Sequence, residues 1–434
     1  MRALVRRTLT PGRVLPLFAP ALSGLVGFLE IAHSQVVLLG AAGLTAASVT
    51  AAVPWFFPVL AVPAIWVPGL RIAGLLSVGD AVLTVAAVLV LLDSRRPRLP
   101  PAGRHILVLL GALLATDSVA VLAHPSRQGA QEVVHRLILV GGGLAVGAWL
   151  VYRARLTLAL RLLVMVSLPI AVVAVIDRLT SGAAAYPLGY HKNFAGPAFA
   201  TASILLLVVP ETLATVGRPL LRWVPFGILL AGLLATSSRG AIIGFVLAVT
   251  VWLLKPRTSH RRVNPVVAVL LVAGLGYLAV SSVQQQLSDQ ASGRVKFDSI
   301  TQRRLVEGET RDLWRTSPLT GVGLRFFATP KFDIYQPPNN MFDEALAEAG
   351  IIGALGLAVF VVGGVVVTFR LKTPPGEAAN MLVLAAFFHG QVDIFWLNGQ
   401  ALNWLIVGAG VALEALAVGP SNVTARGLPE PLRS

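Results

Sequence analysis

The sequence predicts an all-α protein: a polytopic bundle of transmembrane helices with one large extracytoplasmic loop that carries short helices. Of its 434 residues, 56% are hydrophobic and only 13% are charged, whereas soluble globular domains carry about 25% charged residues. This composition excludes a soluble enzyme, a disordered chain and a fibrous protein. Long apolar runs recur along the chain, and about 20 apolar residues suffice to cross a bilayer.

Basic residues between the apolar runs predict the topology. They gather at the N-terminus and in five loops, near residues 95, 155, 220, 257 and 371, while the alternate loops carry little net charge. Because cytoplasmic loops are enriched in Lys and Arg, we predict that these six segments and both termini are cytoplasmic, in a bacterial inner membrane. The same rule accounts for the net charge of +15, so nucleic acid is not an expected partner.

The candidate spans are residues 14–32, 35–53, 55–70, 72–92, 105–123, 133–152, 162–180, 194–214, 223–237, 240–254, 264–282, 346–369, 379–397 and 400–418. Three of them, 55–70, 223–237 and 240–254, are short for a membrane crossing, so we expect about 12 helices, or as many as 14. The first of these three contains several prolines and is expected to be broken or re-entrant.

The chain divides into four parts by composition. N-terminal transmembrane helices occupy 1–282, an Arg-rich extracytoplasmic loop 283–340, C-terminal transmembrane helices 341–418, and a cytoplasmic tail 419–434. The loop contains 14 charged residues, eight basic and six acidic. A large, water-facing, Arg-rich loop in an otherwise apolar protein is the first place to look for chemistry.

Two arginine motifs stand out. Ser238 and Arg239 lie between two short apolar runs, where a serine can cap the following helix and leave N–H groups beside a guanidinium, a combination that suits phosphate. The alternative is an ordinary interfacial arginine. In the loop, Arg303, Glu307 and Arg311 are spaced four apart on one helix face. They form either a salt-bridged exposed helix or a face that grips an anion, with Arg304 beside it.

Three further polar clusters are candidates. His191, Lys192 and Asn193 lie between two spans on the predicted outer side. Asn339 and Asn340 precede three carboxylates, Asp343, Glu344 and Glu348. These carboxylates either stabilise the start of a helix through its dipole or supply a general base. His389 and Asp393 fall inside an apolar stretch, where ionisable residues usually face a cavity or a partner.

The sequence contains no cysteine, and it contains no Walker motif, dinucleotide fingerprint or zinc-ligand spacing. We therefore expect no metal and no cofactor.

In chain order, four of these stretches resemble the O-antigen ligase and O-antigen polymerase (Wzy-like) superfamily. They are His191-Lys192-Asn193 with Gly196, Ser238-Arg239-Gly240, Arg303 through the turn Pro318-Leu319-Thr320-Gly321-Val322-Gly323, and Asn340 through Leu346-Ala347-Glu348-Ala349-Gly350-Ile351-Ile352-Gly353. Each stretch alone is a weak signal, but their order in the chain, together with one large outer loop, is specific to this superfamily.

The resemblance implies a membrane glycosyltransferase that takes a glycan from a polyprenyl-diphosphate carrier, without nucleotide sugars, and passes it to a hydroxyl on a lipid or glycan. The family's two diphosphate-binding arginines correspond to Arg239 and Arg303, with Arg304 as the neighbouring alternative. We therefore expect catalytic roles for Arg239, Arg303, Arg304 and Glu348, and substrate binding by His191, Lys192, Asn193, Ser238, Arg311, Asn339, Asn340 and Asp393.

The sequence departs from the family pattern at one position. The family's histidine, which is proposed to activate the acceptor, corresponds to Asn339, and an amide is no base at neutral pH. The role passes to Asp343, Glu344, Glu348, His191 or another group, or it is not needed. Two rival functions also remain: a transporter or flippase of a lipid-linked glycan, and an inactive assembly scaffold.

Overall fold

The computed structural model describes residues 53–66, 71–72, 76–93, 100–209, 223–255, 299–328, 337–391 and 400–418. The regular elements of this part of the chain are helices, apart from two-residue strands β1 (Arg71–Ile72) and β2 (Leu76–Ser77), which pair antiparallel with Arg71 opposite Ser77. The predicted all-α fold is confirmed for these residues.

Four continuous helical stretches of the described chain are long and apolar enough to cross a membrane. They are α6 (Pro101–Ala123), α7 (Arg127–Arg136) continuing through the π-helical turn η2 (Leu137–Gly142) into α8 (Gly143–Tyr152), α9 (Leu156–Ser181), and α15 (Met341–Phe369). The chain is therefore a membrane protein. The count of 12 to 14 spans stays a prediction.

Shorter apolar helices complete the bundle. They are α5 (Val78–Leu92), α10 (Lys192–Val208), α11 (Trp223–Thr236), α12 (Arg239–Leu254), α16 (Pro374–Gly390) and α17 (Gln400–Val418). The segment predicted to be broken, 55–70, forms the short helix α4 (Phe56–Leu60) and the 3-10 turn η1 (Pro63–Trp66). The predicted spans 14–32 and 264–282, and nearly all of 35–53, lie outside the described residues.

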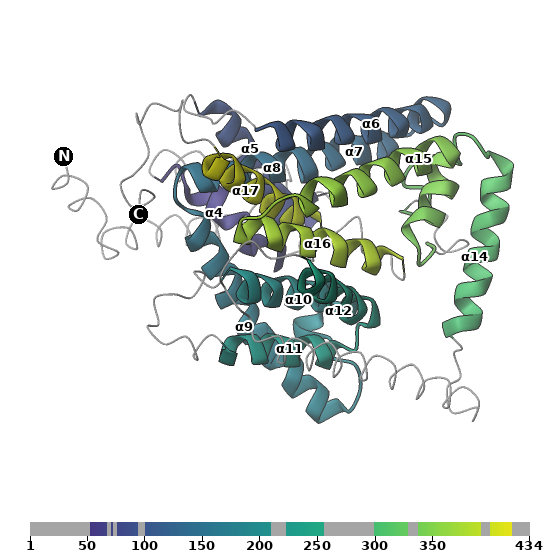
Figure 1. The fold of residues 1–434 in the computed structure, drawn as a ribbon. Coiled ribbons are helices and arrows are strands. Elements are labelled where there is room, and N and C mark those ends of the chain that lie inside the picture. The colour runs from purple at the N-terminus through teal and green to yellow at the C-terminus, as the bar shows by residue number, and fades with distance from the viewer. Residues whose placement is uncertain are drawn as a thin grey trace, which may run out of the picture.

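The helices pack in a layered arrangement (Figure 1). In it, α15 lies along α6, α17 along α8, and α12 along α16, while α9, α10 and α11 form a neighbouring group. Helices α8 and α17 cross so closely that only glycine fits at the contact. A Cβ added to Gly147 would lie 1.8 Å from the Leu405 carbonyl oxygen, and one added to Gly408 would lie 2.2 Å from the Leu144 carbonyl oxygen. Glycine at such crossings lets the two backbones touch, as is common between membrane helices.

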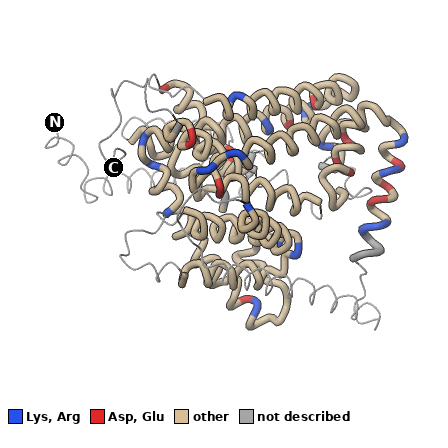
Figure 2. The backbone as a smooth tube through the Cα atoms, in the orientation of Figure 1, with Lys and Arg blue, Asp and Glu red and all other residues tan. Residues whose placement is uncertain are grey.

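Charged residues gather at the two ends of the bundle. Near the C-terminal ends of α8, α12 and α15, Arg153 pairs with Asp93, and the Lys255 Nζ donates to the Leu371 carbonyl oxygen at 2.9 Å. At the other end of α15 stands α14 (Ser299–Thr316), whose charged residues alternate along its length (Figure 2). Among the described residues, the basic side chains Arg153 and Lys255 therefore lie at the end of α15 opposite to α14.

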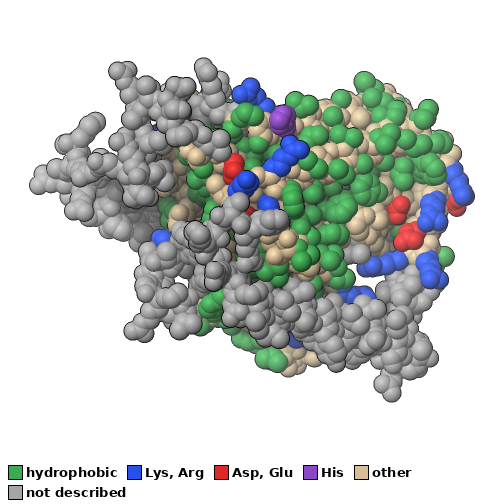
Figure 3. Space-filling view, viewed as in Figure 1, with side chains coloured by type: hydrophobic (Ala, Val, Ile, Leu, Met, Phe, Trp, Pro, Cys, Tyr) green, Lys and Arg blue, Asp and Glu red, His purple; other side chains and the backbone are tan. Residues whose placement is uncertain are grey.

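The surface between these ends is apolar. Val108 and Leu122 of α6 are 70% and 79% exposed, and Leu355 and Val362 of α15 are 61% and 59% exposed. Figure 3 shows apolar side chains covering this face, with charged side chains collected beside α14. Such a surface suits contact with lipid acyl chains.

Candidate functional site

The His191 and Ser238 stretches, predicted separately, meet in the structure. His191 begins α10 as its N-cap, and its Nδ1 accepts the Asn193 N–H at 3.3 Å. One turn later, Gly196 lies against the turn before α12, where a Cβ would be 2.7 Å from the Ser238 Cβ. The Ser238 Oγ donates to the Asn193 Oδ1 at 3.3 Å. These contacts fix the start of α10 against the start of α12.

The start of α12 lacks a side-chain cap. Ser238 occupies the N-cap position, as one of the sequence alternatives proposed, but its hydroxyl bonds to Asn193 and makes no cap hydrogen bond. The preceding Ser237 has a φ of +52°, a left-handed conformation that is unusual for serine. Uncapped N–H groups at a helix start attract anions, and Arg239 is the first residue of this helix.

Arg239 and Arg303 come from different elements and repel each other. Both are half-buried, and the positive charge of Arg303 acts on the Arg239 guanidinium. Within the described ranges, no Asp or Glu forms an ion pair with either guanidinium. Two cations that act on each other and have no carboxylate partner among the described residues suit an anion, and a guanidinium binds a phosphate through two parallel hydrogen bonds.

The remaining charges of α14 are more exposed. Arg304 and Arg311 lie on the surface, and Arg311 interacts electrostatically with Asp343 in the first turn of α15. The predicted pairing of Glu307 with Arg303 and Arg311 is not among the ion pairs of the described residues. Instead, the ion pair of this helix joins Arg315 Nη1 with Asp312 Oδ1 at 2.9 Å.

The two glycine-containing motifs interlock. Helix α15 is broken at Gly350, whose φ of +65° and ψ of −167° are not helical. The turn at 318–323 fills this break. Val322 and Gly323 donate to the carbonyl oxygens of Ala347 (2.8 Å) and Glu348 (2.9 Å), and Ile351 and Ile352 donate to those of Pro318 (2.9 Å) and Leu319 (3.3 Å). Backbone groups freed inside a membrane helix must find partners, and here the turn supplies them.

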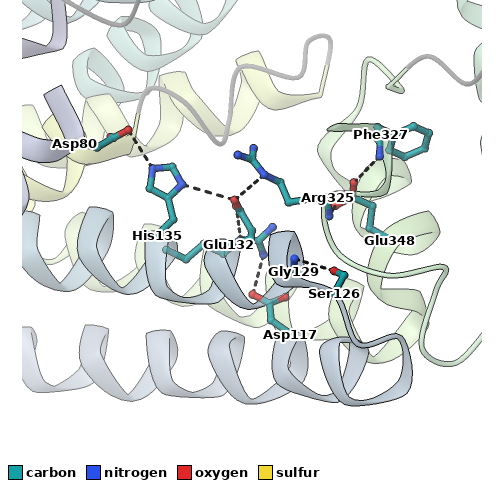
Figure 4. Close-up of polar contacts among 10 residues, drawn as sticks. Asp80, Asp117, Ser126, Gly129, Glu132, His135, Arg325, Phe327 and Glu348 are labelled. Atoms are coloured by element: carbon teal, nitrogen blue, oxygen red, sulfur yellow. Dashed lines mark hydrogen bonds and ion pairs between the residues drawn. The ribbon is translucent and has the colours of Figure 1, made fainter. Parts of the chain in front are cut away.

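Glu348 holds the segment that follows this turn. Its carboxylate is 3% exposed, with Oε2 accepting the Arg325 N–H at 3.0 Å and Oε1 accepting the Phe327 N–H at 3.3 Å (Figure 4). Arg325 has a φ of +63°, and Phe327 lies in the 3-10 turn η6 (Phe326–Ala328). Both oxygens thus hold a strained backbone segment in place.

Replacing Glu348 by Gln is expected to loosen this segment. The amide offers one acceptor where two backbone donors converge, so we expect a loss of about 1–3 kcal/mol of unfolding free energy. Hydrogen exchange at the Arg325 and Phe327 amides should become faster, which mass spectrometry can measure. Glu309→Gln, on the exposed face of α14, is the control. Unchanged exchange combined with lost activity would instead give Glu348 a chemical role.

Asn340 caps α15, as the sequence indicated. Its Oδ1 accepts the N–H groups of Phe342 (2.8 Å) and Asp343 (3.4 Å), and its Nδ2 donates to the Gln391 carbonyl oxygen at 3.4 Å. Asn339, immediately before it, is half-buried. His389 is buried in α16, and Asp393 lies outside the described residues.

Sequence reasoning missed a buried ionic network between α5, α6, α7 and the turn at Arg325 (Figure 4). The Glu132 carboxylate forms three ion pairs. Its Oε1 lies 3.1 Å from the Arg136 Nε, and its Oε2 lies 3.3 Å from the Arg325 Nε and 3.6 Å from the His135 Nδ1. Arg136 also reaches Asp117 at 2.8 Å, and His135 reaches Asp80 at 3.4 Å. The four-residue spacing of Glu132 and Arg136 was the available signal.

A cavity of about 90 Å³ lies between α5, α10, α12, α16 and α17. Its lining is mainly alanine and other apolar side chains. The lining's ionisable side chains are Asp80 and His389, and Phe194 and Ala241 come from the helices that carry the His191 and Ser238 motifs.

Comparison with known proteins identifies a related family. Residues 224–358 match the family model described as O-antigen ligase, Wzy_C. The match includes Ser238, Arg239, Arg303 and Glu348, and it ends inside α15. No curated protein matches the chain. Residues 224–358 are thus similar to the O-antigen ligase family, and this match confirms the resemblance to the O-antigen ligase and polymerase superfamily.

Proposed function

We propose that this enzyme transfers a glycan from a polyprenyl-diphosphate carrier to a hydroxyl on a glycan or lipid, at the outer side of the bacterial cytoplasmic membrane. The O-antigen ligase domain supports the reaction class. The observation that carries the donor assignment is the pair Arg239 and Arg303, two cations that repel each other and have no described carboxylate between them.

A diphosphate is both the binding group of such a donor and its leaving group. As the sugar's anomeric carbon separates from the phosphate oxygen, negative charge grows on that oxygen. Guanidinium groups already fixed beside it stabilise this charge more in the transition state than in the bound donor, which lowers the barrier. In this mechanism the arginines supply the electrostatic stabilisation, and no metal ion is required.

The location of α14 supports an outer-leaflet reaction. It lies at the end of α15 away from Lys255 and Leu371, beside which the sequence predicts basic cytoplasmic loops. Because basic loops favour the cytoplasm, α14 and Arg303 would face the outside. Membrane lipids surround the apolar face, so an amphipathic donor can approach from the bilayer.

The test is the pool of polyprenyl-diphosphate-linked glycan in a deletion strain, resolved by mass spectrometry against wild type. We expect lipid-linked glycan to accumulate at the outer leaflet, as long chains if the enzyme is a ligase and as single repeat units if it is a polymerase. Accumulation confined to the inner leaflet would indicate a transporter. An unchanged pool with unchanged surface glycan would count against glycosyl transfer altogether.

A further inference from the structure

The C-terminal end of α14 is anchored by the turn at 318–323, which follows it almost directly. The Trp314 Nε1 donates to the Pro318 carbonyl oxygen at 3.1 Å, and the Gly321 N–H donates to the Ser317 carbonyl oxygen at 2.8 Å. These bonds tie the last turn of the helix to the segment after it. This segment fills the break in α15, and it also contacts the connection between α6 and α7.

The contact with α6 and α7 has polar and apolar parts. His124 follows α6 directly, and its Nε2 lies 3.5 Å from the Ser317 Oγ and 3.5 Å from the Thr320 Oγ1. A Cβ added to Gly323 would lie 3.1 Å from the His124 Cβ. Leu324, the next residue, is buried and packs against α6 and α15. The segment after α14 is therefore enclosed between α15 and the α6–α7 connection.

A charged contact completes this enclosure at Arg325. Its Nε lies 3.3 Å from the Glu132 Oε2 on α7, while its backbone N–H donates to the Glu348 Oε2 on α15 at 3.0 Å (Figure 4). One residue is thus held by α7 through its side chain and by α15 through its backbone. The Glu132 side chain is only 2% exposed, so water screens this ion pair less than it screens a surface pair.

The position of this segment controls the position of Arg303. Arg303 lies 13 residues before Thr316, the last residue of α14, which corresponds to about 20 Å along the helix axis. A tilt of about 10° at the anchored end would therefore move Arg303 by about 3 Å. A misplacement of about 1 Å in a catalytic arrangement can cost about 10²-fold in rate, so the anchor of α14 matters for a guanidinium at its far end.

We infer that Arg325 is a positioning residue, an assignment that rests on the proposed function. Its ion pair with Glu132 fixes the end of α14 against the N-terminal helices and thereby keeps Arg303 in the donor site. The guanidinium of Arg325 serves this contact and does not bind the diphosphate. Transfer therefore depends on Arg325 through Arg303.

The test is a double-mutant cycle. Arg325→Gln, Arg303→Lys and the double variant are reconstituted in lipid vesicles with a polyprenyl-diphosphate-linked oligosaccharide, and the glycolipid fraction of a deletion strain serves as acceptor. Mass spectrometry measures the transferred glycan, and thermal unfolding in detergent gives the folded fraction. Asp117→Asn is the matched control, because it breaks the buried 2.8 Å pair with Arg136 and leaves the contact of Arg325 in place.

We expect Arg325→Gln to lower transfer per folded protein by about 10²-fold. In the Arg303→Lys background the same change should lower it by no more than about 2-fold further. Arg325→Lys keeps the charge and should recover part of the transfer. Glu132→Gln removes the same ion pair from its other side and should match Arg325→Gln, which keeps the test decisive if the latter fails to fold. Asp117→Asn should retain wild-type transfer per folded protein.

The position of α14 can be measured independently of activity. The chain contains no cysteine, so Leu179→Cys on α9 and Leu305→Cys on α14 introduce a single pair of sites for spin labels. Both side chains are exposed. Double electron–electron resonance should give one narrow distance distribution in wild type and a shifted or broader one in Arg325→Gln.

Three results would overturn the inference. Multiplied losses in the double variant would show that Arg325 acts independently of Arg303. An equal loss in Asp117→Asn would assign the effect to the whole ionic network, and unchanged label distances in Arg325→Gln would show that α14 does not depend on this contact. If wild type forms no product, the proposed function itself fails, and the label distances still decide whether Arg325 positions α14.

Discussion

Substitution of Arg239 or Arg303 by Lys is expected to lower glycan transfer by about 10²–10³-fold, the loss usual for one charge-stabilising donor. Lysine keeps the positive charge but lacks the planar fork that binds two phosphate oxygens at once. Because lysine keeps the positive charge and no described carboxylate forms an ion pair with either guanidinium, each single replacement should leave stability nearly unchanged. Transfer is measured in vesicles, and stability by thermal unfolding in detergent.

Arg315→Lys provides a matched control on the same helix. Arg315 is 70% exposed and pairs with Asp312 on the surface of α14, so its replacement should leave transfer intact. Equal losses at residues 303 and 315 would point to a general effect of α14 charge. Wild-type activity in Arg239→Lys would contradict the diphosphate site.

Gly350→Ala is expected to be the most destabilising single change considered. The backbone conformation at Gly350 is accessible essentially to glycine alone, and forcing another residue into it costs about 1–3 kcal/mol. A Cβ would also lie 2.3 Å from the carbonyl carbon and oxygen of Leu319. Because these are backbone atoms, relief requires the interlocked turn to separate, and we expect the total loss to exceed about 3 kcal/mol.

Gly111→Ala is the comparison for this change. Gly111 lies inside α6, and a Cβ added there would have no neighbouring atom within 4 Å, so alanine should stabilise the helix by about 0.5–1 kcal/mol. Denaturation in mixed detergent measures both variants. A Gly350→Ala protein as stable as wild type would mean that the break in α15 is not required for folding.

Hydropathy and charge predicted much of the architecture because they act over whole segments. The apolar runs at 105–123, 162–180 and 346–369 correspond to α6, α9 and α15. Each helix begins a few residues before its apolar run, after the N-cap residues Pro100, Arg155 and Asn340. The described part of the proline-rich stretch, residues 55–66, is broken into two short helical pieces, as its prolines indicated.

Pairing between distant residues was less accessible to sequence reasoning. The contact of Asn193 with Ser238 depends on how α10 crosses α12, and the approach of Arg303 to Arg239 depends on where α14 lies. Neither follows from local periodicity. Asp117 and the full set of Glu132 contacts were missed for a related reason: Asp117 and Arg136 lie on different helices, and Arg325 pairs with Glu132 from almost two hundred residues further along the chain.

The ionic network has a consequence for how the chain enters the membrane during synthesis. Helices α6 and α7 are made first, and at that stage Glu132 already has His135 and Arg136 as partners on its own helix, while Asp117 has Arg136. Arg325, which also pairs with Glu132, is translated almost two hundred residues later. The ion pair between Glu132 and Arg325 therefore forms only after the helices between them have been made, and it joins the early and the late part of the chain.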